Sequence, residues 1–499
     1  MGKWGPLIAV CLGTFMLLVD VSIVVVALPA MAGGLGASLS DLQWVMDVYA
    51  LVLAALLLAA GAAADVLGGR RIYAAGTVLF AVASLGCGLA TNAPELIALR
   101  AVQGLGAAAM FATTLSLLAT AYQGRDRSVA LGVWGAVNGA AAAAGPVLGG
   151  VLTQGLGWRW IFFINLPVSV AAVWLTLRVV REVRRDPGRR VDWAGTACFA
   201  LFAGAVTYGA VRAGGDGWLS APTGVCAAVA VLGLAAFVLV EQRVTQPLMD
   251  LALFRRASFV TVMATALVFS ASAFTILAYL SVWLQTLLGM SPITGGLALL
   301  PLAAASFLVS AVSGRLLHGV PARYPVGIGT MLVGAGEFAQ AVLGADSSWP
   351  ALTAGLVVTG VGVGLVSPAL SGAALASVPQ REAGMAGGAL NTFRQLGYAL
   401  GIAVFGTVVT SGIASSLHGS AADPDGAARA LAGGGAAGLR GAVPREALRS
   451  AFASGLDTAM MAAGVLAVLA GAAVLIWVRP GRRGAAQVVP EPESAAAAP

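Results

Sequence analysis

The sequence predicts an all-α protein that crosses a lipid bilayer many times. Hydrophobic residues make up 59% of the 499 residues, charged residues make up 10%, and the mean hydropathy is +0.91. A soluble domain carries about 25% charged residues, so this composition indicates a lipid solvent. Apolar runs of about 18 residues or more recur from end to end. In a bilayer such runs form helices, because their backbone groups must be paired internally.

A window of about 20 residues, the helix length that crosses the hydrocarbon core, finds fourteen candidate spans. The first span follows Lys3 and resembles a signal peptide, but it is longer than a signal peptide and contains Asp20, so we interpret it as retained. The fourteen spans are residues 6–28, 46–64, 72–92, 95–119, 128–152, 161–180, 193–212, 221–241, 258–283, 294–316, 324–345, 350–374, 384–412 and 455–478.

The distribution of basic residues predicts the orientation of the chain. If the N-terminus is cytoplasmic and the spans alternate in direction, 20 of the 28 Lys and Arg residues fall in cytoplasmic segments, six fall outside and two lie within spans. Cytoplasmic loops carry such an excess. We therefore predict a multi-pass protein of the inner (cytoplasmic) membrane with both termini in the cytoplasm. The positive charge is a topology signal, and no nucleic-acid partner is expected.

A faint internal repeat indicates two related halves. The loop after the second span contains Gly61, Asp65 and Arg70, and the loop after the tenth contains Gly314 and, in place of the aspartate, a histidine. Duplicated helical bundles of this kind are typical of transporters.

The repeat divides the chain into five predicted segments. They are a six-helix bundle at 1–180, a basic cytoplasmic connector at 181–192, two inserted helices at 193–241, a second six-helix bundle at 242–478 and a disordered tail at 479–499. Within the second bundle, residues 413–454 are expected to form a loose extracytoplasmic loop in which Pro444 opens a short helix.

Few ionisable residues lie at membrane depth, and each is a candidate functional residue because a charge there is costly. Asp20 lies in the first span, Arg100 and Gln103 lie in the fourth, and Glu337 lies near the middle of the eleventh. Arg394 and Gln395 lie in the thirteenth span. An aspartate near an arginine in such a place can exchange a proton, which suits a proton-coupled carrier. The alternative is a purely structural ion pair between Asp20 and Arg100.

A glycine-rich run at residues 135–150 predicts a helix face that another backbone can approach closely. Its small residues recur at helical spacing, and a proline interrupts its hydrogen bonding so that the helix can bend. An ordinary structural helix rich in Gly and Ala is the alternative reading. The residues of the run are Gly135, Gly139, Gly145, Pro146, Gly149 and Gly150.

Together these motifs resemble the major facilitator superfamily, and within it the fourteen-helix drug/proton antiporters. The resemblance rests on residues 17–29, 44–49, 61–71, 100–104, 135–150, 158–167, 192–195 and 391–397. Val25 and Val66 depart from the usual pattern, which has Asn and a basic residue at these positions. The resemblance implies two bundles that rock around a midplane cavity and export drug-like or antibiotic molecules in exchange for protons.

The same resemblance assigns roles to individual residues. Asp20, Arg100 and Glu337 would couple transport to protons, and the run at 135–150 would be the antiporter motif. The substrate cavity would contain Asp20, Val25, Gln103, Asn138, Arg394 and Gln395. The cytoplasmic gate would contain Gly61, Asp65, Gly68, Arg70 and Arg71.

Three other classes of function were weighed. A proton-coupled uptake symporter of a small metabolite remains the alternative on the same fold. An ATP-driven exporter would need a phosphate-binding GxxxxGK[ST] loop, which the sequence lacks. The only histidines, His318 and His418, lie in predicted loops without ligand spacing, so we expect no metal, no cofactor and no enzyme activity. The expected partners are protons, a small-molecule substrate and the lipid bilayer, and the functional unit is expected to be a monomer.

Overall fold

The computed structural model describes residues 2–182, 191–439 and 442–478, and in these residues it contains helices and no β-strand. The helices before the inserted pair are α1 Gly5–Leu35, α2 Leu39–Leu67, α3 Gly69–Leu89, α4 Ala93–Ala121, α5 Gly124–Gly155, α6 Trp160–Phe163 and α7 Asn165–Val179. The inserted pair is α8 Trp193–Asp216 and α9 Ala221–Glu241. Most of the predicted connector, residues 183–190, and the predicted tail from residue 479 lie outside the described residues.

The remaining helices complete an all-α membrane fold. They are α10 Ala257–Val282, α11 Pro292–Ala298, α12 Leu300–Leu316, α13 Arg323–Gln340, α14 Thr353–Ala376, α15 Ala383–Leu417, α16 Pro424–Ala432, α17 Ala436–Leu439 and α18 Arg445–Trp477. Short 3₁₀ turns at Leu251–Arg255, Trp349–Leu352 and Gln380–Glu382 precede α10, α14 and α15, and a π-helical turn at Trp283–Leu287 follows α10.

Each of the fourteen predicted spans coincides with one helix or with two consecutive helices. In the described part of the chain, eleven helical segments are long and apolar enough to cross a membrane. The other three predicted spans correspond to α5, α12 and α13. The all-α membrane fold expected from composition is therefore confirmed.

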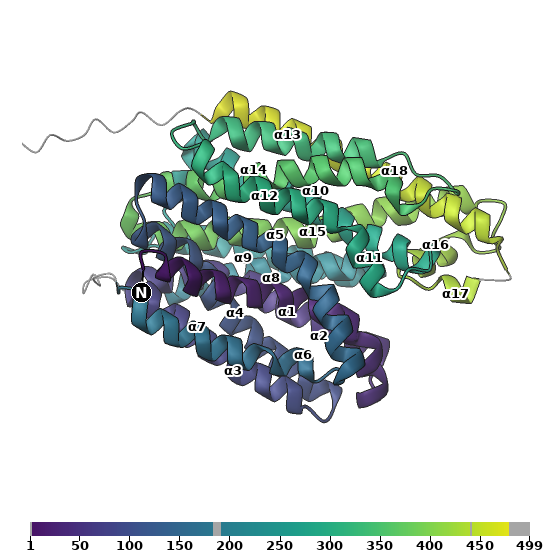
Figure 1. Ribbon diagram of the computed structural model, residues 1–499, viewed down its shortest axis with the longest axis horizontal. Helices are drawn as coiled ribbons and strands as arrows, with labels where there is room; N and C mark the ends of the chain where they lie inside the picture. Colours follow the sequence, from purple (N-terminus) through teal and green to yellow (C-terminus); the bar gives the residue numbers. More distant parts are fainter. Residues whose placement is uncertain (1, 183–190, 440–441, 479–499) are drawn as a thin grey trace, which may run out of the picture.

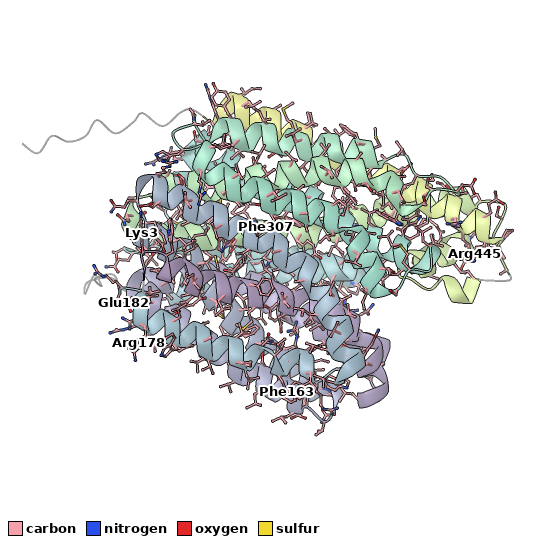
Figure 2. All side chains as sticks on the ribbon, viewed as in Figure 1. Lys3, Phe163, Arg178, Glu182, Phe307 and Arg445 are labelled. Carbon is pink, nitrogen blue, oxygen red and sulfur yellow. The ribbon has the colours of Figure 1, made fainter. Side chains whose placement is uncertain are left out.

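The long helices run side by side along the longest axis of the molecule (Figure 1). Helix α1 begins and α18 ends at the same end, which we call the terminal end, whereas α16 and α17 lie at the opposite, distal end. Charged side chains mark both ends: Lys3, Arg178 and Glu182 lie at the terminal end and Arg445 at the distal end (Figure 2).

Two seams join helices α1–α7 to helices α10–α18. In the first seam α5 packs along α12, and in the second α2 packs along α15. The inserted helix α8 contacts both α2 and α15, and it also packs on its partner α9. The inserted pair therefore lies beside the second seam, where it touches both sides of it.

Two expectations about helix ends were wrong. Helix α13 ends at Gln340, because the next backbone segment turns to donate the Leu343 N–H to Asp457 of α18. Glu337 therefore lies in the last turn of α13 and not near the middle of a span.

The segment 413–454 is also more ordered than expected. Helix α15 continues to Leu417, and Asp423 caps α16 by accepting a hydrogen bond from Gly426 N–H. Pro444 does not open a separate short helix: it is the cap of the continuous 33-residue helix α18. Buried side chains of α16, including Leu431, give it a tertiary anchor that composition did not reveal.

Candidate functional site

A closed polar cluster joins α1, α4 and α7 around the carboxylate of Asp20. Arg100 Nη1 lies 2.7 Å from Asp20 Oδ2, and the two side chains are 2% and 0% exposed. Gln103 Nε2 donates to Asp20 Oδ1 at 3.0 Å, and Asn165 Nδ2 donates to the same oxygen at 2.8 Å. Three N–H donors therefore enclose one carboxylate away from solvent.

A second layer of contacts fixes those donors. Arg100 Nε donates to the carbonyl of Val45 at 3.0 Å, and its guanidinium lies 4.1 Å from the ring centroid of Tyr49. Gln103 Nε2 also donates to Ser84 Oγ at 2.7 Å. A proton added to Asp20 would remove the charge that strengthens the hydrogen bonds from these donors. These hydrogen bonds connect α1 to α4 and α7.

The interruption of the helix between α6 and α7 positions Asn165 in this cluster. Helix α6 ends at Phe163, and Asn165 is the first residue of α7. Pro167 follows in the first turn, where the missing N–H costs no helical hydrogen bond. Sequence reasoning placed Asn165 inside a family motif but gave it no role, and it missed Ser84 entirely.

At the terminal end, Asp65 joins the second seam. Its two oxygens accept the backbone N–H groups of Gly384 and Met385, each at 2.8 Å, in the first turn of α15. A carboxylate at a helix N-terminus is stabilised by these free N–H groups and by the helix dipole. Gly61 packs directly on the Gly384 carbonyl, and a Cβ at position 61 would collide with it.

The other predicted gate residues bind within the first half of the chain. Arg70 Nη2 donates to the Leu177 carbonyl at 2.8 Å, and Arg71 Nε lies 3.6 Å from Glu182 Oε2. Gly68 ends α2 at φ +103°, a conformation that favours glycine. The predicted gate thus separates into Gly61 and Asp65, which contact α15, and a basic pair that fastens the α2–α3 turn to the end of α7.

The second copy of the repeat makes the matching contact on the first seam. A Cβ at Gly314 would collide with the Ser128 carbonyl of α5, and His318 Nδ1 lies 3.2 Å from Ser128 Oγ. The two repeated loops therefore contact opposite halves of the molecule at the same end.

The glycine run on α5 packs on α1 at one set of positions and on the consecutive helices α11 and α12 at another. Gly135 and Gly139 pack on Ser310 and Ser306 of α12, whereas Gly145 and Gly149 pack on Ser22 and Ile23 of α1, and Gly150 packs on Ile293 of α11. The side chain of Pro146 lies outside the described residues. Gly132, which sequence reasoning did not include, also contacts α12: its carbonyl accepts a hydrogen bond from Ser310 Oγ at 2.9 Å.

The remaining predicted residues lie apart from the Asp20 cluster. Val25 is 53% exposed, and the Asn138 amide donates to the Trp134 carbonyl on its own helix at 2.6 Å. Arg394 and Gln395 are half-buried on α15. Glu337 is buried, and its Oε2 has no hydrogen-bond partner among the described residues.

Comparison with known proteins identifies the family to which this chain is similar. The family model of the Major Facilitator Superfamily matches residues 10–402. The chain is 35% identical over 413 residues to the multidrug resistance protein Stp of Mycobacterium tuberculosis (strain CDC 1551 / Oshkosh), which covers 83% of this chain and 77% of that one. It is 33% identical over 492 residues to the tetracenomycin C resistance and export protein of Streptomyces glaucescens, covering 95% and 91%.

A solved structure confirms the fold independently of sequence identity. The proton:xylose symporter XylE superimposes with a TM-score of 0.63 at only 12% sequence identity, and the match covers 96% of each chain. The matched relatives are transporters and not enzymes. On the extent of the family match and the identity to these relatives, the chain belongs to the Major Facilitator Superfamily.

Proposed function

We propose that this protein is a proton-coupled antiporter that exports drug-like or antibiotic molecules across the cytoplasmic membrane by alternating access. Two of its relatives are named for multidrug resistance and for the export of tetracenomycin C. The observation that carries the coupling is the enclosed Asp20 carboxylate, which is held by donors from two other helices. Glu337, whose Oε2 has no partner among the described residues, is a secondary acidic site in this proposal.

In the proposed cycle, proton binding at Asp20 releases one of its donors and loosens α1 from α4 and α7. Helix α1 packs on α5 through Gly145 and Gly149, so its movement reaches the first seam. The Asp65 contact with α15 closes the terminal end in the conformation described above. Breaking that contact exposes the substrate cavity, which Val25, Asn138, Arg394 and Gln395 would line with the Asp20 cluster.

The proposed orientation places the terminal end in the cytoplasm, as the distribution of basic residues predicts. The two six-helix bundles would meet at the two seams, and α8 and α9 would be an insert beside the second. Substrate would enter from the cytoplasm or the inner leaflet, and protons would enter from outside. The functional unit would be a monomer.

The test compares Asp20→Asn with the parental protein in inverted vesicles under an imposed proton gradient. Uptake of fluorescent drugs should fall to the background of empty vesicles, whereas exchange of labelled for unlabelled drug without a gradient should persist. Asp126→Asn is the control, because Asp126 pairs with Lys3 at 2.7 Å on the exposed terminal end. Parental uptake by Asp20→Asn would refute the coupling role, and accumulation only in right-side-out vesicles would favour the uptake symporter.

A further inference from the structure

One basic side chain at membrane depth lacks a counter-charge. Arg394 is half-buried on α15, and it makes no ion pair and no hydrogen bond with any of the described residues. The guanidinium carbon of Arg394 lies 6.0 Å from the ring centroid of Phe269 on α10. An unpaired charge inside a bilayer is costly and is retained mainly where it serves a function.

Neighbouring turns of α15 show where Arg394 lies. One turn earlier, Asn391 Nδ2 donates to the Phe111 carbonyl of α4, across the junction of the two halves. One turn later, Gly397 packs on the Leu267 carbonyl of α10. Residues three apart on a helix share a face. Arg394 therefore lies where α15 meets both α4 and α10, beside the junction at which the halves separate in the proposed cycle.

The buried acids nearest in depth are already engaged or lie elsewhere. Asp20 is neutralised by Arg100 at 2.7 Å. Glu337 belongs to a turn of α13 whose glycines pack on other helices: Gly336 packs on Thr359 of α14, and Gly334 packs on Gly464 of α18. The net charge that the described residues offer to a substrate at this junction is therefore positive.

We propose that the exported substrate is an organic anion, and that its carboxylate or phenolate pairs with Arg394. A guanidinium presents a planar fork of donors that matches a carboxylate in two parallel hydrogen bonds. The half-buried ring of Phe274, which meets the buried Phe269 ring edge to face at 5.6 Å, adds an aromatic surface for the apolar part of such a molecule. This inference rests on the proposed export function and specifies its substrate class.

The proposal has an electrical consequence. If an anion leaves while a proton enters, negative charge moves outward and positive charge moves inward in the same cycle. An interior-negative membrane potential then drives transport in addition to the pH gradient. Exchange of a monovalent cation for one proton would move no net charge. Because Asp20 and Arg394 lie on different halves, the proton and the anion do not compete for one carboxylate.

The first experiment measures binding to the purified full-length protein by fluorescence polarisation. Fluorescein and rhodamine 6G share a three-ring skeleton but carry negative and positive charge, and a set of aromatic acids with their neutral esters supplies further matched pairs. The anionic members should bind at least about tenfold more tightly, as expected for a charge-assisted hydrogen bond to Arg394. If no anion binds more tightly than its matched partner, the proposal is overturned, whatever the variants do.

Variants locate the binding. Arg394→Gln should weaken anion binding about tenfold or more, and Arg394→Lys should retain part of it because the charge remains without the fork. Arg178→Gln is the matched control, since Arg178 also lies over an aromatic ring, at 5.8 Å from Trp174, but at the end of α7. Equal weakening by both glutamine variants would overturn the assignment. If Arg394→Gln fails to fold, the lysine variant and the parental charge preference still decide.

Transport in proteoliposomes separates this proposal from the proposed function. A potassium diffusion potential without a pH gradient should accelerate anion export by the parental protein. Proton-driven export that ignores the potential and selects cations would refute the anion proposal and leave antiport intact. Anion binding that depends on Arg394, with no response to protons, would refute antiport and leave the substrate class intact.

Discussion

Replacing Asp65 with asparagine should open the terminal end of the molecule. The two oxygens of Asp65 accept N–H groups of Gly384 and Met385 at 2.8 Å each, whereas an asparagine has one acceptor oxygen and directs its NH₂ at the other N–H group. The loss of one charge-assisted bond costs about 1.5–3 kcal/mol, and the lost charge at the helix N-terminus costs about 0.3–1 kcal/mol. Asp65 is half-buried, so screening by water favours a total near 2 kcal/mol.

This free energy stabilises only the closed conformation, because the contact joins two halves that separate on opening. At about 1.4 kcal/mol for each factor of ten, the open population should rise roughly 30-fold. Met385 is buried in the closed form. A Met385→Cys variant in which the four native cysteines are replaced therefore reports opening through the labelling rate of its single cysteine.

A membrane-impermeant maleimide should label Met385→Cys faster in Asp65→Asn than in the parental background. The acceleration should appear in inverted vesicles and not in right-side-out vesicles, because the terminal end is predicted to be cytoplasmic. Asp126→Asn, which removes an exposed acid at the same end, should leave the rate unchanged. If Asp65→Asn labels at the parental rate, the closed conformation does not depend on this contact and the reasoning fails.

Two further predictions concern packing. A Cβ at Gly132 would lie 2.7 Å from the Ser310 carbonyl, so Gly132→Val should lower export in inverted vesicles at least about tenfold. Gly155→Val on the same helix should leave export unchanged, because a Cβ at Gly155 would have no described atom within 4 Å. Export by Gly132→Val at the Gly155→Val rate would contradict a tight first seam. Glu337→Gln removes a buried, unpartnered carboxylate oxygen, so the melting temperature in detergent should stay constant or rise by about 1–4 °C; a clear fall would show that the carboxylate stabilises the fold.

The positions of the helices and part of the Asp20 cluster could be predicted from sequence because both depend on the cost of polarity in lipid. Apolar runs indicate spans directly, and a charge within such a run stands out, which is how Asp20 and Arg100 were found. Ser84 and Asn165 give no such signal, since neutral polar residues are common in membrane helices. Their role depends on contacts between helices: Asn165 reaches Asp20 across 145 positions of the chain.

The partners of the glycine run could not be predicted from spacing alone. A four-residue interval indicates a face of small residues, but it does not indicate which helix covers that face. Six residues separate Gly139 from Gly145, which turns the helix by about 240° at 100° per residue. This rotation is why Gly135 and Gly139 face α12, whereas Gly145 and Gly149 face α1. A single interface was implied by the sequence pattern, and the structure contains two.

Those two interfaces make α5 the mechanical connection between the carboxylate and the opposite half. Ser22 and Ile23, which pack on Gly145 and Gly149, lie one turn or less beyond Asp20 on α1. Contacts through glycine leave no side chain of α5 between the helices to absorb a shift, and packed interiors transmit strain. A displacement of α1 on protonation of Asp20 would therefore pass to α5, and through Gly132 to α12. Direct contact between Asp20 and the second half is not required for coupling in this arrangement.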